Sequence, residues 1–444
     1  MNVVTRFAPS PTGLLHAGNY RTAIFAYLFA RHHGGTNILR IEDTDRERSK
    51  KEYEDNILES LAWLGIEHDQ FMRQSEHSSR HADVLKSLIE NGHAYVSKES
   101  PRDEGERSEV IRFKNPKKKI TFTDVVRGAI TMDTSDLGDF VIAKSMHEPI
   151  FHLVNVADDI EQGVTHIVRG EDHVSNTPRQ LLIFEALGAT PPVYIHLPLV
   201  LAPDRTKLSK RKGALPLLEY RDRGYVPQAL FNYLSLLGWN PGTDEELLSK
   251  SELIERFTED QIQKSPAIFD DQKLKWFNRE YMLRLDTPSF WEHAEEFLSE
   301  ETVTMLDAKG IWESVVPVMR ERSHTFMDVR AMDENGDIRC FYETPTYDPA
   351  LLLWKKDPVR ERTAARLAKA TDLLRNIDSS SWNRESIEST LMPLAEAEGK
   401  GEVLWPVRVA LSGRDKSPDP FTIAGIIHKD ETIHRLEHAQ SLLS

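Results

Sequence analysis

Short apolar runs rich in β-branched residues alternate with helical patterns in the first part of the chain. Residues 2–7 and 37–41 have the composition of buried strands, and apolar positions at helical spacing follow them over 15–32 and 51–65. Glycine follows or ends each helical pattern, as it often does at the end of a helix. The order strand–helix–strand–helix predicts parallel strands joined by right-handed crossovers.

The same alternation returns after a long interruption. Residues 165–168 and 194–201 are predicted strands, and a predicted helix over 178–187 lies between them. The interruption, residues 74–149, has a different period, with a helix over 78–91 and short β-like runs at 110–114, 120–122 and 129–132. We therefore predict an α/β domain with a Rossmann-like parallel sheet that carries an α+β insertion.

After about residue 225 the pattern is helical almost throughout. The amphipathic segments are 229–237, 250–257, 270–284, 290–298, 357–377, 386–398 and 432–443. Turn-forming residues at 241–242 and 286–288 mark candidate junctions. The predicted fold class is thus a Rossmann-like parallel-sheet domain followed by an all-helical C-terminal half.

Composition excludes several classes of protein. No apolar run approaches the ~20 residues of a membrane span, and the first residues lack the basic and apolar segments of a targeting peptide, so we expect a cytoplasmic protein without membrane partners. Cys340 is the only cysteine, which rules out an intrachain disulfide and a cysteine-based zinc site. Signatures of serine hydrolases, zinc proteases, Walker-type nucleotide sites and dinucleotide sites are absent, and no bound metal is expected.

The acidic total charge narrows the kind of nucleic-acid contact that is possible. The chain has 56 basic and 71 acidic residues, a net charge of −15. That balance argues against a non-specific nucleic-acid coat, but a local basic patch is enough to meet phosphates. One such patch has five basic residues within 205–212.

Charged and small polar residues gather just beyond the ends of the predicted strands. They occupy segments 6–10, 16–19, 169–173 and 204–212, together with Glu42. In open parallel sheets, ligands bind beyond the carboxyl ends of the strands, where the strand order reverses. We therefore expect these distant stretches to meet in one site.

Two of the segments suit phosphate. His16, Gly18 and Asn19 begin a predicted helix, where free N–H groups and the helix dipole favour anions. Lys207 and Lys210 could meet charge that develops on a polyphosphate. His16 could also be an ordinary helix cap.

The other segments suit a small zwitterion. Arg6 and Arg169 could each hold a carboxylate, because a guanidinium pairs with it through two hydrogen bonds. Glu42 could hold an ammonium group, or could pair with Arg40 or Arg46. Asp172 could equally be a helix cap.

These residues carry a family resemblance. Residues 9–19, PSPTGLLHAGN, resemble the HIGH signature of class I aminoacyl-tRNA synthetases in its glutamyl form, and 207–211, KLSKR, resembles the paired KMSKS loop. Residues 40–45, RIEDTD, and 169–178, RGEDHVSNTP, are typical of glutamyl-tRNA synthetases. Residues 406–413, PVRVALSG, resemble a segment of the bacterial anticodon-binding domain. The resemblance spans essentially the whole chain.

The resemblance implies a glutamate–tRNA ligase. Such an enzyme uses ATP with Mg²⁺ to convert L-glutamate into glutamyl-adenylate, and then transfers the glutamyl group to the terminal adenosine of tRNA(Glu). Some relatives also charge tRNA(Gln). No covalent enzyme intermediate is needed, so positioning and charge stabilisation carry the catalysis. We expect a monomer.

The resemblance also assigns roles by position. The implied catalytic residues are His16, Asn19, Lys207 and Lys210. The implied ATP-binding residues are these four together with Gly18, Asp172 and Val200. The implied glutamate-binding residues are Arg6, Ala8, Ser10, Glu42, Phe151, Asn155 and Arg169. Candidate tRNA contacts in the helical half are Arg320, Arg322, Arg330 and Arg408.

The resemblance implies four domains, made of five segments of the chain. The catalytic domain takes 1–73 and 150–225, and the insertion at 74–149 is expected to hold the acceptor end of the tRNA. Residues 226–288 are expected to contact the stem, and 289–444 to read the anticodon, whose unstacked bases offer readable edges.

The sequence departs from the family at two places. Phe151 stands where the family usually has tyrosine, so a hydroxyl that could bond glutamate is missing. The segment between Tyr95 and Val110 is short and has no cysteine, whereas many relatives have a longer, sometimes zinc-bearing, segment there.

Three alternatives are compatible with parts of this pattern. Shortened relatives that glutamylate a modified tRNA base lack the C-terminal domain that is present here. A catalytically inactive tRNA-binding paralogue would not need the retained His16, Lys207, Lys210 and Arg169. A non-discriminating enzyme, or one that prefers tRNA(Gln), has the same motifs and stays open.

Overall fold

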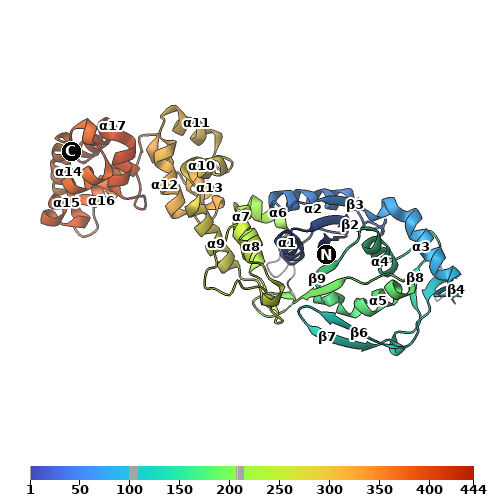
Figure 1. Cartoon of the computed structure of the whole chain (residues 1–444). Helices are drawn as coiled ribbons and strands as arrows, with labels where there is room; N and C mark the ends of the chain where they lie inside the picture. The colour runs from blue at the N-terminus through green and yellow to red at the C-terminus, as the bar shows by residue number, and fades with distance from the viewer. Residues whose placement is uncertain (1, 100–108, 207, 209–214) are drawn as a thin grey trace. The chain divides into compact units, whose positions relative to one another are not determined.

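The parallel strands predicted for the first half are present in the computed structural model, which describes residues 2–99, 109–206, 208 and 215–444. The chain forms two compact units, Met1–Asn278 and Arg279–Ser444, shown with their elements in Figure 1. The first unit combines sheets and helices and the second is helical. The predicted fold class is therefore confirmed.

The N-terminal segment forms a parallel three-stranded sheet in the order β1-β2-β3. Its elements are β1 (Val4–Phe7), α1 (Ala17–His32), β2 (Thr36–Ile41), α2 (Lys51–Trp63) and β3 (Gln70–Arg73). The sequence pattern did not predict β3. Only its Met72 is buried, so this edge strand lacks the apolar run by which β1 and β2 were recognised.

The second sheet has the order β7-β6-β10-β9. Its strands are β6 (Lys119–Asp124), β7 (Gly128–Asp133), β9 (His166–Gly170) and β10 (Val193–Leu197), with α5 (Thr177–Ala186) between β9 and β10. The amide of Thr165 donates to the Val4 carbonyl at 3.0 Å, which joins the start of β9 to β1. The carboxyl ends of β1 and β9 thus border the point at which strand order reverses.

The β6–β7 hairpin comes from the predicted insertion but hydrogen-bonds to strand β10 of the parallel sheet. Tyr194 of β10 pairs with Asp124 of β6 in parallel register. Alternate residues of β6 are buried, as expected for a strand with one face on the core. The division of the sequence into domains stays a prediction, and the structure shows that strands β6 and β7 of the 74–149 segment extend the sheet of β9 and β10.

The remainder of the insertion packs against helices α4 (Phe151–Glu161) and α5. It contains α3 (Ser78–Glu90) and an antiparallel sheet of β4 (Ala94–Lys98), β5 (Glu109–Phe113) and β8 (Phe140–Ala143), which is followed by α4. One core joins all of these to α5, with Leu85, Phe113, Ile142, Leu153 and Ile183 among its buried members.

The segment that follows the second sheet packs on α1. It contains β11 (Val200–Leu201), α6 (Leu217–Asp222), α7 (Pro227–Ser235), α8 (Lys250–Arg256), β12 (Ala267–Ile268) and α9 (Asp271–Arg284). Arg21 of α1 is buried and donates to the carbonyls of Pro198 and Leu237. Phe25 of α1 meets Phe257 edge to face, with ring centroids 5.6 Å apart. These contacts fix the N-terminal end of the helical region to the sheet.

The second unit contains the remaining helices. They are α10 (Thr287–Glu295), α11 (Glu300–Ala308), α12 (Trp312–Arg322), α13 (Phe326–Glu334), α14 (Arg360–Arg375), α15 (Arg384–Glu398), α16 (Lys400–Ser412) and α17 (Pro420–Leu443). The predicted helix at 432–443 therefore starts earlier, and α17 has a kink at His428, whose φ is 64°. Buried Arg435 of α17 donates to the carbonyls of Cys340, Leu411 and Glu343 and so ties three segments together.

Replacing Gly35 with alanine is expected to destabilise the first unit by about 1–3 kcal/mol. A Cβ at this position would lie 2.2 Å from the Val3 carbonyl oxygen, because the turn after α1 passes closely over the start of β1. Thermal unfolding would measure the loss. Gly34→Ala tests strain instead of crowding, because the φ of Gly34 is +60° and its Cβ would have open space.

Candidate active site

The N-terminus of α1 is organised by His16 and Asn19. His16 is the N-cap residue, and its Nδ1 accepts the Gly18 amide at 3.1 Å. The Asn19 side chain accepts the His16 amide at 3.1 Å, which completes a reciprocal capping box. The capping alternative for His16 is therefore present in the structure, and it places the ring proton on Nε2. Capping orients the ring and does not exclude a role toward phosphate.

Two of the segments that contain predicted ATP-binding residues meet at this helix end. A Cβ built on Gly18 would lie 3.9 Å from Cβ of Val200, which places β11 against the start of α1. Pro216 forms an isolated β-bridge with His16, so the chain beyond the KMSKS-like segment returns to the same place. Lys207 and Lys210 lie outside the described residues, and their predicted roles stay predictions.

The loops after β1 and β2 are joined by a backbone hydrogen bond. The Glu42 amide donates to the Pro9 carbonyl at 2.9 Å, which brings Glu42 beside the loop that contains half-buried Ala8 and Ser10. Desolvation raises the pKa of Glu42 to about 7, although Arg40 and Arg6 act to lower it. A half-buried carboxyl with this pKa loses its proton readily when a cation binds beside it.

A buried carboxylate that the sequence analysis did not identify holds two arginines in place. Asp159 of α4 accepts Arg6 Nε at 3.2 Å and Arg40 Nη2 at 2.6 Å. Burial alone would raise the pKa of Asp159, but Arg40 and Arg6 hold it below its usual range. Arg40 also donates to Gln162 at 2.8 Å through Nε. The Asp159 contact thus fixes the side chain of Arg6 near the end of β1.

Asn155 belongs to a second buried network. Its side-chain oxygen accepts Gln74 Nε2 at 2.9 Å, and Gln74 also donates to Asp158 at 2.7 Å. His81 of α3 meets Asp158 at 2.6 Å. The network connects α3 and α4, and it fixes the amide of Asn155 close to Glu42.

Arg169 is a buried cation whose described partners are all neutral. Its Nε donates to His196 at 3.1 Å, Nη1 to Gln180 at 2.8 Å and Nη2 to Thr177 at 2.9 Å. No carboxylate among the described residues lies within ion-pair distance of it. Burial lowers the pKa of Arg169 to about 10, so the group stays charged at neutral pH. A buried cation without a counter-ion suits an anionic ligand.

Two other predicted residues lie near the end of β9. Phe151 begins α4, and its ring centroid is 5.9 Å from that of His173. Burial lowers the pKa of His173 to about 4, so this ring is neutral near pH 7. Asp172 is exposed, in a short 3-10 helix over Glu171–Asn176. Phe151 thus lies beside His173, just beyond the end of β9. The predicted contact of Asp172 with ATP stays a prediction.

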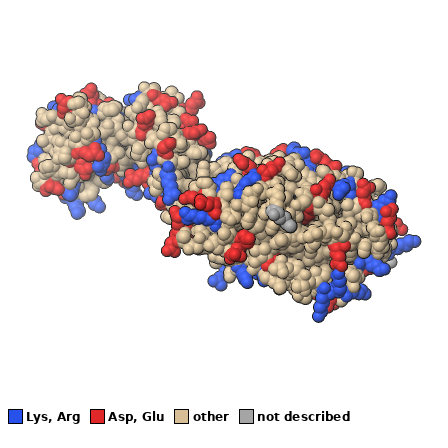
Figure 2. Space-filling model, viewed as in Figure 1, with Lys and Arg blue, Asp and Glu red and all other residues tan. Residues whose placement is uncertain are grey.

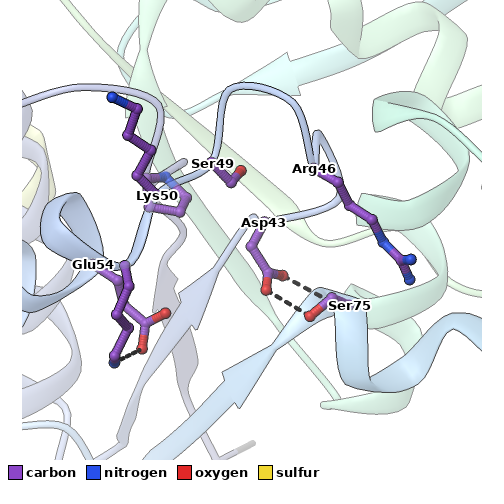
Figure 3. A pocket seen from close by; sticks show the side chains of 8 residues that line it. Asp43, Arg46, Ser49, Lys50, Glu54 and Ser75 are labelled. Atoms are coloured by element: carbon purple, nitrogen blue, oxygen red, sulfur yellow. Dashed lines mark hydrogen bonds and ion pairs between the residues drawn. The ribbon is translucent and has the colours of Figure 1, made fainter.

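Open space exists beside the loops that contain the candidate residues. A pocket of about 340 Å³ is lined by Pro11, Asp43, Arg46, Ser49, Lys50, Lys51, Glu54 and Ser75 (Figure 3). Asp43 accepts the Ser75 hydroxyl at 2.5 Å, which ties the loop after β2 to the end of β3. The pocket adjoins the chain next to Ser10 and Glu42, but the predicted site residues do not line it.

The four arginines proposed to contact tRNA have different surroundings. Arg320 lies over the Phe290 ring at 5.3 Å and Arg330 over Phe297 at 5.4 Å, both half-buried. Arg408 is half-buried on α16, whereas Arg322 is exposed at the end of α12. Their tRNA contacts stay predictions, and Arg322 is the most accessible of the four.

The sequence analysis missed the residues that hold the arginines. Asp158 and Asp159 are adjacent acids in the mostly apolar run LVNVADDI, and His196 is a lone histidine in the apolar run VYIHLPLV. A charged residue in an apolar element is rarely buried without a partner. That rule could have indicated Asp159 and His196, but not which arginine each of them meets.

No three His, Cys, Asp or Glu side chains in the described ranges gather as metal ligands would. None of the described helices is long and apolar enough to cross a bilayer.

Comparison with known proteins gives consistent relationships. Residues 2–104 and 99–276 match the family model described as tRNA synthetases class I (E and Q), catalytic domain, and 289–440 match an anticodon binding domain. A glutamate–tRNA ligase of Aquifex aeolicus is 48% identical over 63% of this chain and 67% of its own length. Glutamate–tRNA ligase 1 of Alkalilimnicola ehrlichii is 37% identical over 98% of this chain and 97% of its own.

A solved structure is similar over its whole length. The glutamate tRNA ligase of Elizabethkingia meningosepticum, determined in complex with its amino acid, superposes with a TM-score of 0.84 at 29% identity, covering 100% of both chains.

Proposed function

The chain belongs to the class I tRNA synthetases of the glutamate type, and on that premise we propose which of its side chains bind glutamate, ATP and tRNA. The reaction is ATP-dependent ligation of glutamate to tRNA. A glutamate α-carboxylate oxygen attacks the α-phosphorus of ATP, and the bond to pyrophosphate breaks. The terminal ribose hydroxyl of the tRNA then attacks the acyl carbon, and AMP leaves.

The buried, carboxylate-free Arg169 supports the glutamate assignment most directly. Three of its five N–H groups are used by His196, Gln180 and Thr177, which leaves one on each Nη. Two such donors are what a bidentate carboxylate takes. We assign Arg169 to the side-chain carboxylate of glutamate.

The other polar groups fit the rest of the amino acid. Glu42 meets the ammonium group, and its pKa near 7 falls when that cation binds. Arg6, held by Asp159, supplies positive charge beside the α-carboxylate, together with Ala8, Ser10, Phe151 and Asn155 as further lining. Positioning of the carboxylate for attack is the main contribution of these groups.

ATP is assigned to the end of α1. His16, Gly18 and Asn19 are placed at the helix N-terminus, where the dipole favours phosphate, and Val200 lies against Gly18. Mg²⁺ accompanies ATP as part of the substrate complex and neutralises the triphosphate. Lys207 and Lys210 are proposed to meet the same phosphates, and Asp172 the ribose.

The tRNA is assigned to both units. Exposed Lys114, Lys117 and Lys119 lie where β5 leads into β6, and Figure 2 shows basic side chains gathered at that end of the β6–β7 hairpin. Phosphate contacts by such residues position a nucleic acid without reading its sequence. Arg320, Arg322, Arg330 and Arg408 are the proposed contacts in the anticodon-binding part.

The direct test is ATP–pyrophosphate exchange with glutamate, run with and without tRNA. Exchange that depends on glutamate supports the proposed active site, whereas no exchange under either condition identifies an inactive tRNA-binding paralogue. Charging of purified tRNA(Glu) and tRNA(Gln) separates a discriminating from a non-discriminating enzyme. We further propose a cytoplasmic monomer, and light scattering that shows a dimer would contradict the oligomeric state.

Phe151→Tyr is expected to lower the KM for glutamate about three- to tenfold. The added hydroxyl supplies a hydrogen bond that phenylalanine lacks, and one such bond is worth about 1 kcal/mol. Steady-state charging at varied glutamate would measure the change. The KM for ATP is the internal control, and an unchanged glutamate KM would show that Phe151 lies outside the glutamate pocket.

A further inference from the structure

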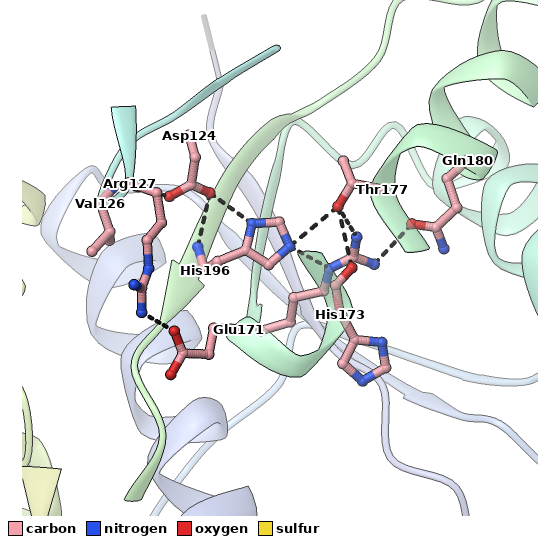
Figure 4. Close-up of polar contacts among 9 residues, drawn as sticks. Asp124, Val126, Arg127, Glu171, His173, Thr177, Gln180 and His196 are labelled. Atoms are coloured by element: carbon pink, nitrogen blue, oxygen red, sulfur yellow. Dashed lines mark hydrogen bonds and ion pairs between the residues drawn. The ribbon is translucent and has the colours of Figure 1, made fainter. Parts of the chain in front are cut away.

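The carboxylate of Asp124, at the end of β6, is fully buried and fully occupied. Its Oδ1 accepts the amides of Val126 and Arg127 at 3.0 and 2.8 Å. Its Oδ2 accepts the amide of His196 at 3.0 Å and Nδ1 of the same residue at 2.7 Å (Figure 4). Four donors leave no acceptor site for a substrate, so Asp124 acts through His196.

The polar neighbours of the His196 ring all fit the same tautomer: Asp124 at Nδ1, and Arg169 together with the Thr177 hydroxyl, which lies 3.3 Å away, at Nε2. Because Nδ1 faces a carboxylate, it carries the proton, and Nε2 keeps its lone pair. An arginine Nε can only donate, and Arg169 Nε lies 3.1 Å from His196 Nε2. The opposite tautomer, or a protonated ring, would place two N–H groups against each other at this contact.

The Tyr194 ring contacts both His196 and Arg169. It stacks on the His196 ring, with centroids 5.7 Å apart and planes inclined by only 3°. The Arg169 guanidinium lies 5.2 Å from the Tyr194 centroid. Arg169 is thereby fixed at Nε and across one face, while Gln180 and Thr177 fix Nη1 and Nη2.

We propose that Asp124 and His196 are positioning residues that orient Arg169 and so set affinity and selectivity for the side-chain carboxylate of glutamate. This inference rests on the proposed role of Arg169. Asp124 fixes the His196 tautomer, the His196 lone pair fixes the rotation of the guanidinium, and the two remaining N–H groups then face one carboxylate. An amide in place of that carboxylate would put an NH₂ group against one of these donors.

The test uses two replacements of His196, each of which keeps one of the two hydrogen bonds that the ring makes with Arg169 and Asp124. In His196→Gln, the amide oxygen takes the place of Nε2 and accepts from Arg169. In His196→Asn, the amide nitrogen takes the place of Nδ1 and donates to Asp124, but the acceptor of Arg169 Nε is lost. We expect His196→Gln to keep the glutamate KM within about threefold, and His196→Asn to raise it about tenfold.

Asp124→Asn completes the set. In the native background it removes the group that fixes the tautomer, and we expect a rise of about tenfold in glutamate KM. In the His196→Gln background the glutamine no longer depends on Asp124, so the same change is expected to add less than about twofold. Inhibition by glutamine is the selectivity readout, and its Ki divided by the glutamate KM should fall in Asp124→Asn and His196→Asn.

Controls separate positioning from damage to the fold. Asp133→Asn makes the same chemical change on the same hairpin, where the carboxylate is exposed and caps Ser135, and should leave the glutamate KM unchanged. The KM for ATP and the thermal unfolding midpoint are recorded for every variant. A rise in the ATP KM that matches the rise in the glutamate KM would overturn the proposal, because the defect would then be general.

Different results would contradict the glutamate-binding role of Arg169 and the positioning role of His196. If Arg169→Ala leaves glutamate KM unchanged, the assignment of Arg169 fails, and this inference fails with it. If Arg169→Ala raises glutamate KM but His196→Asn and His196→Gln behave alike, only the positioning role is overturned.

Discussion

Arg169→Ala is expected to lower kcat/KM for glutamate by about 10²–10⁴, with little change in the KM for ATP. Removing one partner of a buried, hydrogen-bonded charge pair costs about 2–5 kcal/mol or more, since the ligand's carboxylate is left without its counter-charge. Arg169 is 6% exposed and its described hydrogen-bond partners are neutral, so none of them can supply the lost positive charge. Charging assays at varied glutamate and saturating ATP would measure the loss.

Arg179→Ala is the matched control. Arg179 lies on α5 two residues after Thr177, donates to the Ser175 carbonyl at 3.0 Å and sits over the Phe140 ring. It shares the local positive charge but not the buried position, and we expect kcat/KM within about threefold of the native value. Equal losses in the two variants would mean that general electrostatics, and not a carboxylate contact, explains the effect.

Glutamate affinity is expected to fall as pH drops below about 7, by nearly tenfold per pH unit well below that value. The pKa of Glu42 is raised to about 7, so the free enzyme holds a neutral carboxyl below that pH. A bound ammonium favours the ionised form, so binding must expel the proton, and affinity is lost as pH falls through 7. The pH profile of kcat/KM for glutamate would show this loss. Burial lowers the pKa values of the nearby His152 and His173 to about 4, so these two rings do not titrate near pH 7.

Glu42→Gln is expected to remove that pH dependence and to raise glutamate KM about 100-fold, because the ammonium loses its counter-ion. Glu47→Gln changes an exposed carboxylate in the same loop and should leave both the profile and the KM as they are. A Glu42→Gln enzyme that still loses affinity below pH 7 would show that another group titrates.

The periodicity of apolar residues was sufficient to predict the strands and helices that have a clearly apolar face. The strands at β1, β2, β9 and β10 and most long helices were predicted close to their observed positions. It failed for β3, which has a single buried residue, and for α4, whose run LVNVADDI contains two acids. Both elements owe their place to tertiary contacts that local patterns do not report.

Sequence alone could propose only candidate residues at or just beyond strand ends. Arg6, Glu42 and Arg169 became candidates because polar residues at the ends of buried strands are conspicuous, and the loop bearing Glu42 does meet the loop after β1. Their roles stay predictions. Asp159 and Asp124 were not found, because a residue that holds another residue has no local signature. Their partners lie 153 and 72 residues away, at Arg6 and His196.

The hydrogen bonding of β6 to β10 has a consequence for building chimeric enzymes. The insertion looks like a module that could be exchanged between relatives to alter acceptor-end recognition. Yet Asp124, which belongs to that stretch, contacts His196 on the neighbouring strand, beside the proposed glutamate-binding Arg169. A graft with its junctions at 74 and 149 would therefore import a foreign support for the pocket, and junctions that leave the 119–133 hairpin in its native sequence would keep the original one.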